Sequence, residues 1–139
     1  MDAERTDERA ESQRLRLVIF SFGFKHGVPV DANMLFDVRF LPNPYWQEHL
    51  RAKSGLQQEV SEYVVASDQG KDFLRLLKPL LFSVGVETVG NRKELRIAIG
   101  CTGGRHRSVA VVEALAREFE QDSRFEVRPC HRDIDRDSH

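Results

Sequence analysis

The chain has 139 residues, of which 31% are charged and 40% are hydrophobic, and its formal net charge is −1. This length suits one domain with a real core, and the near-neutral charge excludes binding to nucleic acid through a globally basic surface while permitting a local basic face. Only two cysteines occur, and the sequence has neither an apolar leader nor a transmembrane stretch. These features predict a cytoplasmic protein without a disulfide or a membrane partner.

The first third of the chain changes from a polar tail to strands. Residues 1–14 are almost wholly charged or polar and are expected to form a disordered tail. The apolar run Leu15–Phe20 is typical of a central strand. Apolar and polar residues alternate over Phe36–Phe40, which predicts a second, shorter strand. Pro42 and Pro44 should end it, because proline cannot donate to a β-ladder.

The middle of the chain is predicted to be helical. Residues 45–51 fit one or two helical turns, and residues 56–66 place apolar side chains on one side of a helix. Residues 71–84 have the spacing of a longer helix, in which Pro79 predicts a kink or a break into two helices.

The last third alternates between strands and a helix. Strands are expected over Leu95–Gly100 and Phe125–Arg128, a helix over Val109–Phe119, and a short polar tail over residues 134–139. Such alternation predicts a single α/β domain over residues 15–133, with a mostly parallel central sheet flanked by helices.

The segment between the third strand and the last helix carries the most informative chemistry. A turn from strand to helix leaves backbone N–H groups free at a helix N-terminus, where the macrodipole favours an anion. Gly103 and Gly104 can adopt positive φ and let the backbone approach a ligand, and the Arg107 guanidinium matches phosphate oxygens. The segment therefore predicts a phosphate-binding loop made of Thr102, Gly103, Gly104, Arg105, His106, Arg107 and Ser108. It lacks the Gly-x4-Gly-Lys-Ser/Thr pattern of Walker nucleotide sites.

Polar segments follow each of the other predicted strands as well. In a parallel sheet these segments meet at the carboxyl edge, where ligands of open α/β proteins bind. We expect His26 to be a further ligand residue there. Additional contacts to the ligand or to RNA are predicted at Lys25, Arg39, Asn43, His131 and Arg132. Cations gathered on one side would attract phosphates and polyanions.

A second interpretation of the loop is catalytic. Cys101, Arg107 and Ser108 have the Cys-x5-Arg-Ser/Thr spacing of cysteine-dependent phosphatases, in which a thiolate attacks phosphorus. Gly100 stands where such enzymes usually carry histidine, and no aspartate-bearing general-acid loop is evident. The other interpretation of Cys101 is an inert thiol at the end of a buried strand. The cysteines and histidines fit no standard zinc spacing, so neither a metal nor a cofactor is predicted.

Four motifs in order resemble one known family. They are SFGFKHG at residues 21–27, FDVRFLPNP at 36–44, GCTGGRHRSV at 100–109 and HRD at 131–133. Together they resemble the C-terminal domain of the RNase adapter protein (RapZ) family, over residues 15–133. Family members also carry a kinase-like domain with a P-loop, a motif that this sequence does not contain.

The resemblance implies a regulator rather than a catalyst. It implies a module that senses glucosamine-6-phosphate, binds small regulatory RNA and self-associates as a homo-oligomer. The loop at residues 102–108 would hold the sugar phosphate, and His26 would lie on the ligand side.

Overall fold

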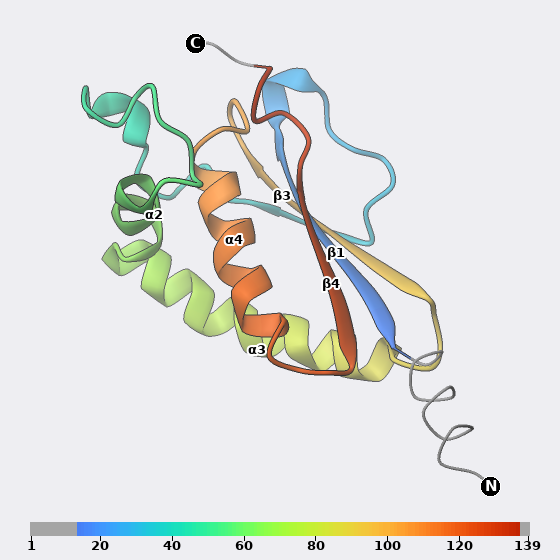
Figure 1. Cartoon of the computed structure of the whole chain (residues 1–139). Coiled ribbons are helices and arrows are strands. Elements are labelled where there is room, and N and C mark those ends of the chain that lie inside the picture. Colours follow the sequence, from blue (N-terminus) through green and yellow to red (C-terminus); the bar gives the residue numbers. More distant parts are fainter. Residues whose placement is uncertain (1–13, 137–139) are drawn as a thin grey trace, which may run out of the picture.

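The computed structural model describes residues 14–136 and contains a four-stranded sheet in the order β2-β3-β1-β4 (Figure 1). The strands are β1 (Leu15–Gly23), β2 (Met34–Asp37), β3 (Glu94–Cys101) and β4 (Phe125–His131). All neighbouring strands in it are parallel. The predicted single α/β domain with a parallel sheet is confirmed, and the carboxyl ends of all four strands lie at one edge.

The helices cover one face of this sheet (Figure 1). They are α2 (Gln58–Val65), α3 (Asp68–Thr88) and α4 (Arg107–Phe119). Two short 3-10 helices, η1 (Phe24–His26) and η2 (Pro44–Trp46), lie beyond the carboxyl ends of β1 and β2. The helix α4 packs directly against β1, β3 and β4. Its N-terminus therefore lies at the same edge as the strand ends.

The main core lies between the sheet and the helices. Leu17 and Ile19 of β1, Ile97 and Ile99 of β3, and Leu115 of α4 are all fully buried there. A strand that is buried on both faces has a nearly continuous apolar sequence, as β1 does. Removal of this apolar surface from water is the main stabilising contribution to the fold.

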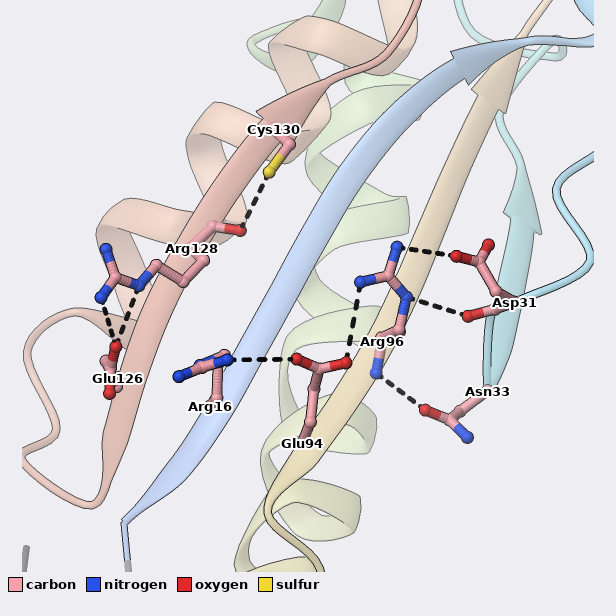
Figure 2. A network of polar contacts seen from close by, with 8 residues as sticks. All are labelled: Arg16, Asp31, Asn33, Glu94, Arg96, Glu126, Arg128 and Cys130. Atoms are coloured by element: carbon pink, nitrogen blue, oxygen red, sulfur yellow. Dashed lines mark hydrogen bonds and ion pairs between the residues drawn. The ribbon is translucent and has the colours of Figure 1, made fainter.

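The opposite face of the sheet has a smaller core and a row of ion pairs (Figure 2). The small core consists of Val18, Phe20, Phe22 and Ala98. Beyond it, Glu94 pairs with Arg16 and with Arg96, each at 3.7 Å, and Arg96 pairs with Asp31 at 3.1 Å. Arg96 thus connects β3 to the segment that precedes β2.

The second strand differs from its predicted bounds. It covers Met34–Asp37 and not Phe36–Phe40. The Oδ1 atom of Asp37 accepts a hydrogen bond from the backbone nitrogen of Arg39 at 2.9 Å, and this local contact turns the chain away from β3.

The helical prediction for the middle of the chain needs one correction. The helix α3 continues through Pro79 instead of breaking there. Pro79 is exposed, so the carbonyl that loses its helical partner lies on the solvent side, where water can satisfy it. The turns predicted at residues 45–51 are present, because η2 ends at Trp46 and the carbonyl of Gln47 then accepts from the backbone nitrogens of Leu50 at 2.9 Å and Arg51 at 3.0 Å.

The two predicted tails lie largely outside the described residues. Of residues 1–14 only Arg14 is described, and it donates to the carbonyl of Phe125 at 3.1 Å. The segment 134–139 is described as far as Arg136, which pairs with Asp133 at 3.0 Å. Within residues 14–136, no helix has the length and apolar character needed to cross a bilayer.

Candidate functional site

A cavity of about 870 Å³ opens beyond the carboxyl end of β3. One wall comes from the loop that joins β3 to α4, and the other from the segment around η2. Its lining combines cationic, aromatic and small polar side chains: Lys25, Asn43, Tyr45, Trp46, Glu48, Arg51, Ala52, Cys101, Thr102, Gly103, Arg105, His106 and Arg107. Four of these side chains are lysine or arginine and one is a carboxylate. The cavity is therefore strongly electropositive.

The loop between β3 and α4 is anchored on the end of β1 through a glycine. Gly104 has φ of +82°, and a Cβ atom there would lie 2.6 Å from the backbone nitrogen of Gly23. Gly103 lines the cavity but is not among the described glycines with positive φ. The expectation that both glycines use positive φ is thus wrong for Gly103, and Gly104 serves the packing of the loop against β1.

Arg107 begins α4 as a buried cation in the cavity wall, with 6% of its surface exposed. Its NH1 atom donates to the carbonyl of Arg39 at 2.6 Å and its NH2 atom to Thr102 Oγ1 at 3.3 Å. Within residues 14–136 it forms no ion pair with a carboxylate. Burial is the largest cause that lowers the pKa of Arg107, although arginine remains charged at neutral pH. An anion in the cavity would supply the missing opposite charge.

Arg105 holds three separate segments together at the edge of the cavity. Its NH2 atom donates to the carbonyl of Ala52 at 2.7 Å, Nε to that of Lys53 at 3.3 Å, and NH1 to that of Ile134 at 3.1 Å. These contacts join the loop to the opposite wall and to the end of the chain. The charge of Arg105 faces the cavity region while its donors serve the framework.

His106 contributes a neutral ring to the same wall. Burial is the first cause that lowers the pKa of His106 below its usual value. Its Nε2 atom lies 3.1 Å from the carbonyl oxygen of Arg51. Because a carbonyl only accepts, Nε2 carries the ring proton in this contact. His106 thus secures the Arg51 segment and adds no positive charge at pH 7.

The last strand residue and the second residue of α4 face each other beneath the loop. Cys101 Sγ lies 3.1 Å from Ser108 Oγ, and both side chains are buried. Cys101 borders the cavity, whereas Ser108 lies outside its lining. Ser108 is therefore placed to act on Cys101 rather than on a ligand.

The segment after β1 presents Lys25 to the cavity instead of His26. The two residues are neighbours in η1. The Nε2 atom of His26 is buried and has no hydrogen-bond partner within residues 14–136.

The predicted contacts that follow β2 divide into two groups. Asn43 lines the cavity and caps η2, where its Oδ1 atom accepts from the backbone nitrogen of Tyr45 at 3.1 Å. Arg39 instead pairs with Asp37 at 2.7 Å and stacks on Phe24 with its guanidinium 4.0 Å from the ring centre. Arg39 does not belong to the cavity lining.

The predicted contacts that follow β4 stabilise the framework outside the cavity. His131 lies between Ser21 Oγ at 2.8 Å and Glu113 Oε2 at 2.7 Å. Arg132 pairs with Asp133 at 2.8 Å and donates to the carbonyl of Gly27 at 2.6 Å. Neither side chain lines the cavity.

Comparison with protein families places this geometry in a known context. The family model described as RapZ C-terminal domain matches residues 15–135. The chain belongs to the RapZ C-terminal domain family. The match covers the whole sheet, its helices and the cavity.

Relatives of this RapZ C-terminal domain are longer proteins. A nucleotide-binding protein of Geobacillus thermodenitrificans is 50% identical over 119 residues, which are 85% of this chain and 39% of the relative. Nucleotide-binding proteins of Rhodococcus jostii and Mycobacterium ulcerans are 44% and 48% identical over 132 and 125 residues, with 92% and 87% of this chain and 42% and 40% of the relatives covered. The chain thus spans about two-fifths of the length of these curated relatives.

Sequence reasoning missed one wall of the RapZ-domain cavity. The sequence predicted only one or two helical turns over residues 45–51, whereas the structure places four of these side chains in the cavity lining: Tyr45, Trp46, Glu48 and Arg51. No spacing rule links this segment to the loop, since they lie more than fifty residues apart. The signal that could have found it is an indole directly after a proline-rich turn at a strand end.

Proposed function

We propose that this RapZ C-terminal domain is a non-catalytic regulatory module that binds a phosphorylated small molecule in the cavity beyond β3. The observation that carries the proposal is Arg107, a buried guanidinium that lines the cavity and forms no ion pair with a carboxylate within residues 14–136. Burial of a charge without an opposite charge is costly, and a bound phosphate would offset that cost.

The lining favours a phosphate monoester on a compact body. The loop lacks the Walker pattern, although the relatives are named nucleotide-binding proteins. The resemblance implies glucosamine-6-phosphate, and the ligand residues that we propose are Thr102, Gly103, Arg107 and Lys25. Gly104, Arg105, His106 and Ser108 hold the loop in shape, and His26 remains a predicted ligand residue beside Lys25.

A groove of about 920 Å³ between α3 and the end of α4 is a weaker alternative site. Its lining includes Lys78 together with Glu87, Glu118 and Asp122. This excess of carboxylates disfavours a phosphate.

Ligand-induced stabilisation tests the proposal. The melting temperature of the full chain would be measured with glucosamine-6-phosphate, glucosamine, inorganic phosphate and ATP. We expect the phosphosugar to raise it most, and Lys25→Ala to weaken this rise. Lys93→Ala, which removes an exposed lysine before β3, is the matched control and should bind as the wild type does. If none of these ligands raises the melting temperature, the proposal is contradicted.

Small regulatory RNA and a second copy of the chain are further proposed partners, in a cytoplasmic setting. Binding to a labelled small RNA should weaken steeply between low and physiological salt, because phosphate contacts release counterions. RNA binding that does not depend on salt, or no RNA binding at all, would exclude the RNA partner.

Sedimentation of the full chain tests self-association, and a monomer at all concentrations would contradict it.

One contact favours a second candidate function, that of a cysteine-dependent phosphatase. The Ser108 hydroxyl, 3.1 Å from Cys101 Sγ, can donate to a thiolate. That thiolate would attack phosphorus as the bond to the leaving oxygen breaks, and water would then release phosphate from sulfur. Turnover of p-nitrophenyl phosphate that disappears in Cys101→Ser would establish this function. Phosphosugar binding without turnover would exclude it.

A further inference from the structure

The outer side of α3 carries an exposed row of side chains, Leu76, Leu80, Ser83 and Glu87. They are three or four residues apart, so they lie in one line along the helix, and we call them the α3 row. Leu76 is 63% exposed and Leu80 is 49% exposed. Apolar side chains in this spacing are the pattern by which one helix packs on another.

The α3 row borders a groove where α3 passes the end of α4 (Figure 1). The groove has a volume of about 920 Å³, and Ser83 and Glu87 belong both to the row and to the groove lining. Phe82 also lines it, is 39% exposed, and stacks on Phe119 with 6.1 Å between ring centres. The leucines, the small Ser83 and this ring therefore form one continuous surface, and contiguous apolar surface of this kind marks a site of interaction.

The groove is electronegative. Two of its three carboxylates have cationic partners, because Glu118 pairs with Lys78 at 2.9 Å and Asp122 pairs with Arg124 at 2.7 Å. The third, Glu87, forms no ion pair within the described part of the chain. It lies in the last turn of α3, and the C-terminal end of a helix carries a negative partial charge. A cation that binds beside Glu87 is therefore stabilised by the carboxylate and by the helix end together.

We propose that the α3 row and the adjoining groove dock a basic amphipathic helix of another protein. Apolar side chains spaced three and four residues apart on that helix would pack on Leu76 and Leu80, and a lysine or arginine would pair with Glu87. The row extends about 17 Å at 1.5 Å per residue, so the partner helix needs about twelve residues. The groove lies at the C-terminal end of α4, whereas the phosphate loop precedes its N-terminus, so this surface is separate from the ligand cavity.

Two designed peptides test the chemistry of the partner. Both are fluorescein-labelled helical peptides of about 18 residues with leucines spaced three and four residues apart. One carries lysines beside the leucines, and the other carries glutamates at the same positions. Fluorescence anisotropy would measure their binding to the full chain. We expect the lysine peptide to bind more tightly by roughly tenfold or more, as a charge-assisted hydrogen bond gives. Equal affinities of the two peptides, or no binding of either, would overturn the proposal.

Charge reversal tests whether the peptides bind at the α3 row. Glu87→Lys should weaken binding of the lysine peptide by roughly tenfold and strengthen binding of the glutamate peptide. Leu76→Gln combined with Leu80→Gln should weaken both peptides, and glutamine keeps a high helix propensity, so α3 should still form. Glu62→Lys, at an exposed carboxylate of α2, is the matched control and should keep the wild-type preference. If Glu87→Lys binds both peptides as the wild type does, the row is not the docking site.

A second copy of the chain is the competing occupant of this surface. Sedimentation of the wild type and of the variant with both Leu76→Gln and Leu80→Gln distinguishes the two occupants. We expect both chains to sediment alike, because the row is kept for a different protein. If the wild type self-associates and the variant is a monomer, the row is an interface between copies and the proposal is wrong.

Discussion

The Oδ2 atom of Asp133 accepts a hydrogen bond from the backbone nitrogen of Gly23 at 2.8 Å, and this contact ties the end of the chain to the end of β1. Asp133 is fully buried, and Arg132 and Arg136 donate to the same carboxylate. Gly23 also adjoins Gly104 of the ligand loop. The carboxylate therefore supports the loop from behind without touching the cavity.

Removal of the Asp133 charge should change the pH dependence of stability. Burial tends to raise the pKa of Asp133, but hydrogen bonds from Arg132, Gly23 and Arg136 hold it below its usual value. Its stabilising contribution is then complete above the unfolded-state pKa, about 3.9, and is lost as the pH falls below that value. We expect Asp133→Asn to lower the free energy of unfolding at pH 7 by about 1–3 kcal/mol.

Urea unfolding between pH 3 and pH 7 measures this difference, which should narrow as the pH falls below about 4. The control Asp72→Asn alters an exposed carboxylate on α3 that pairs with Arg75. Its unfolding curve should stay near that of the wild type. If the difference in free energy of unfolding between Asp133→Asn and the wild type stays constant from pH 7 to pH 3, the charge of Asp133 is not the cause of the lost stability.

Gly104 and Gly27 both have positive φ, so replacing each by alanine compares the destabilisation caused by a side chain in two different surroundings. Their φ angles are +82° and +97°, but a Cβ at Gly104 would meet the Gly23 backbone whereas one at Gly27 would have nothing within 4 Å. Gly27→Ala should cost about 1–2 kcal/mol of strain alone. Gly104→Ala should cost about 3 kcal/mol or more and weaken phosphosugar binding. If thermal unfolding shows that Gly27→Ala and Gly104→Ala lose the same amount of stability, the loop does not pack closely on β1.

Arg105 should matter for stability as well as for binding. Arg105→Ala removes donors to the exposed carbonyl of Ala52 and to the half-buried carbonyls of Lys53 and Ile134, and it leaves the latter two unpaired. We expect a loss of about 2–4 kcal/mol and faster amide exchange in both cavity walls. Arg75→Ala on the outer side of α3 should change stability by about 0.5 kcal/mol or less. Unchanged exchange in Arg105→Ala would contradict the role assigned to this side chain.

Replacement of the proline inside α3 should make the protein more stable. Pro79→Ala restores a backbone donor within an exposed stretch of helix and should stabilise the chain by about 1–3 kcal/mol. Thermal unfolding measures the gain, with Ser83→Ala one turn later as a control within about 0.5 kcal/mol of the wild type. A loss of stability in Pro79→Ala would indicate that the proline contributes contacts that outweigh its missing hydrogen bond.

The local sequence pattern determined most of the strands and the parallel arrangement of the sheet. The continuous apolar runs at Leu15–Phe20 and Leu95–Gly100 predicted two buried strands, and their alternation with helices predicted the parallel sheet. The glycine-rich turn into α4 marked the loop that lines the cavity, because free N–H groups at a strand-to-helix turn are a property of local geometry.

Only the tertiary structure decided which polar side chains share the cavity. Lys25 and His26 are neighbours in the sequence and both can carry a positive charge, but only Lys25 lines the cavity. His131 is held by Ser21 and Glu113 from two other elements, and Asp133 by the end of β1. The wall with Trp46 and Glu48 meets the loop through contacts between segments more than fifty residues apart. Such contacts depend on how the elements pack, and no local periodicity encodes that packing.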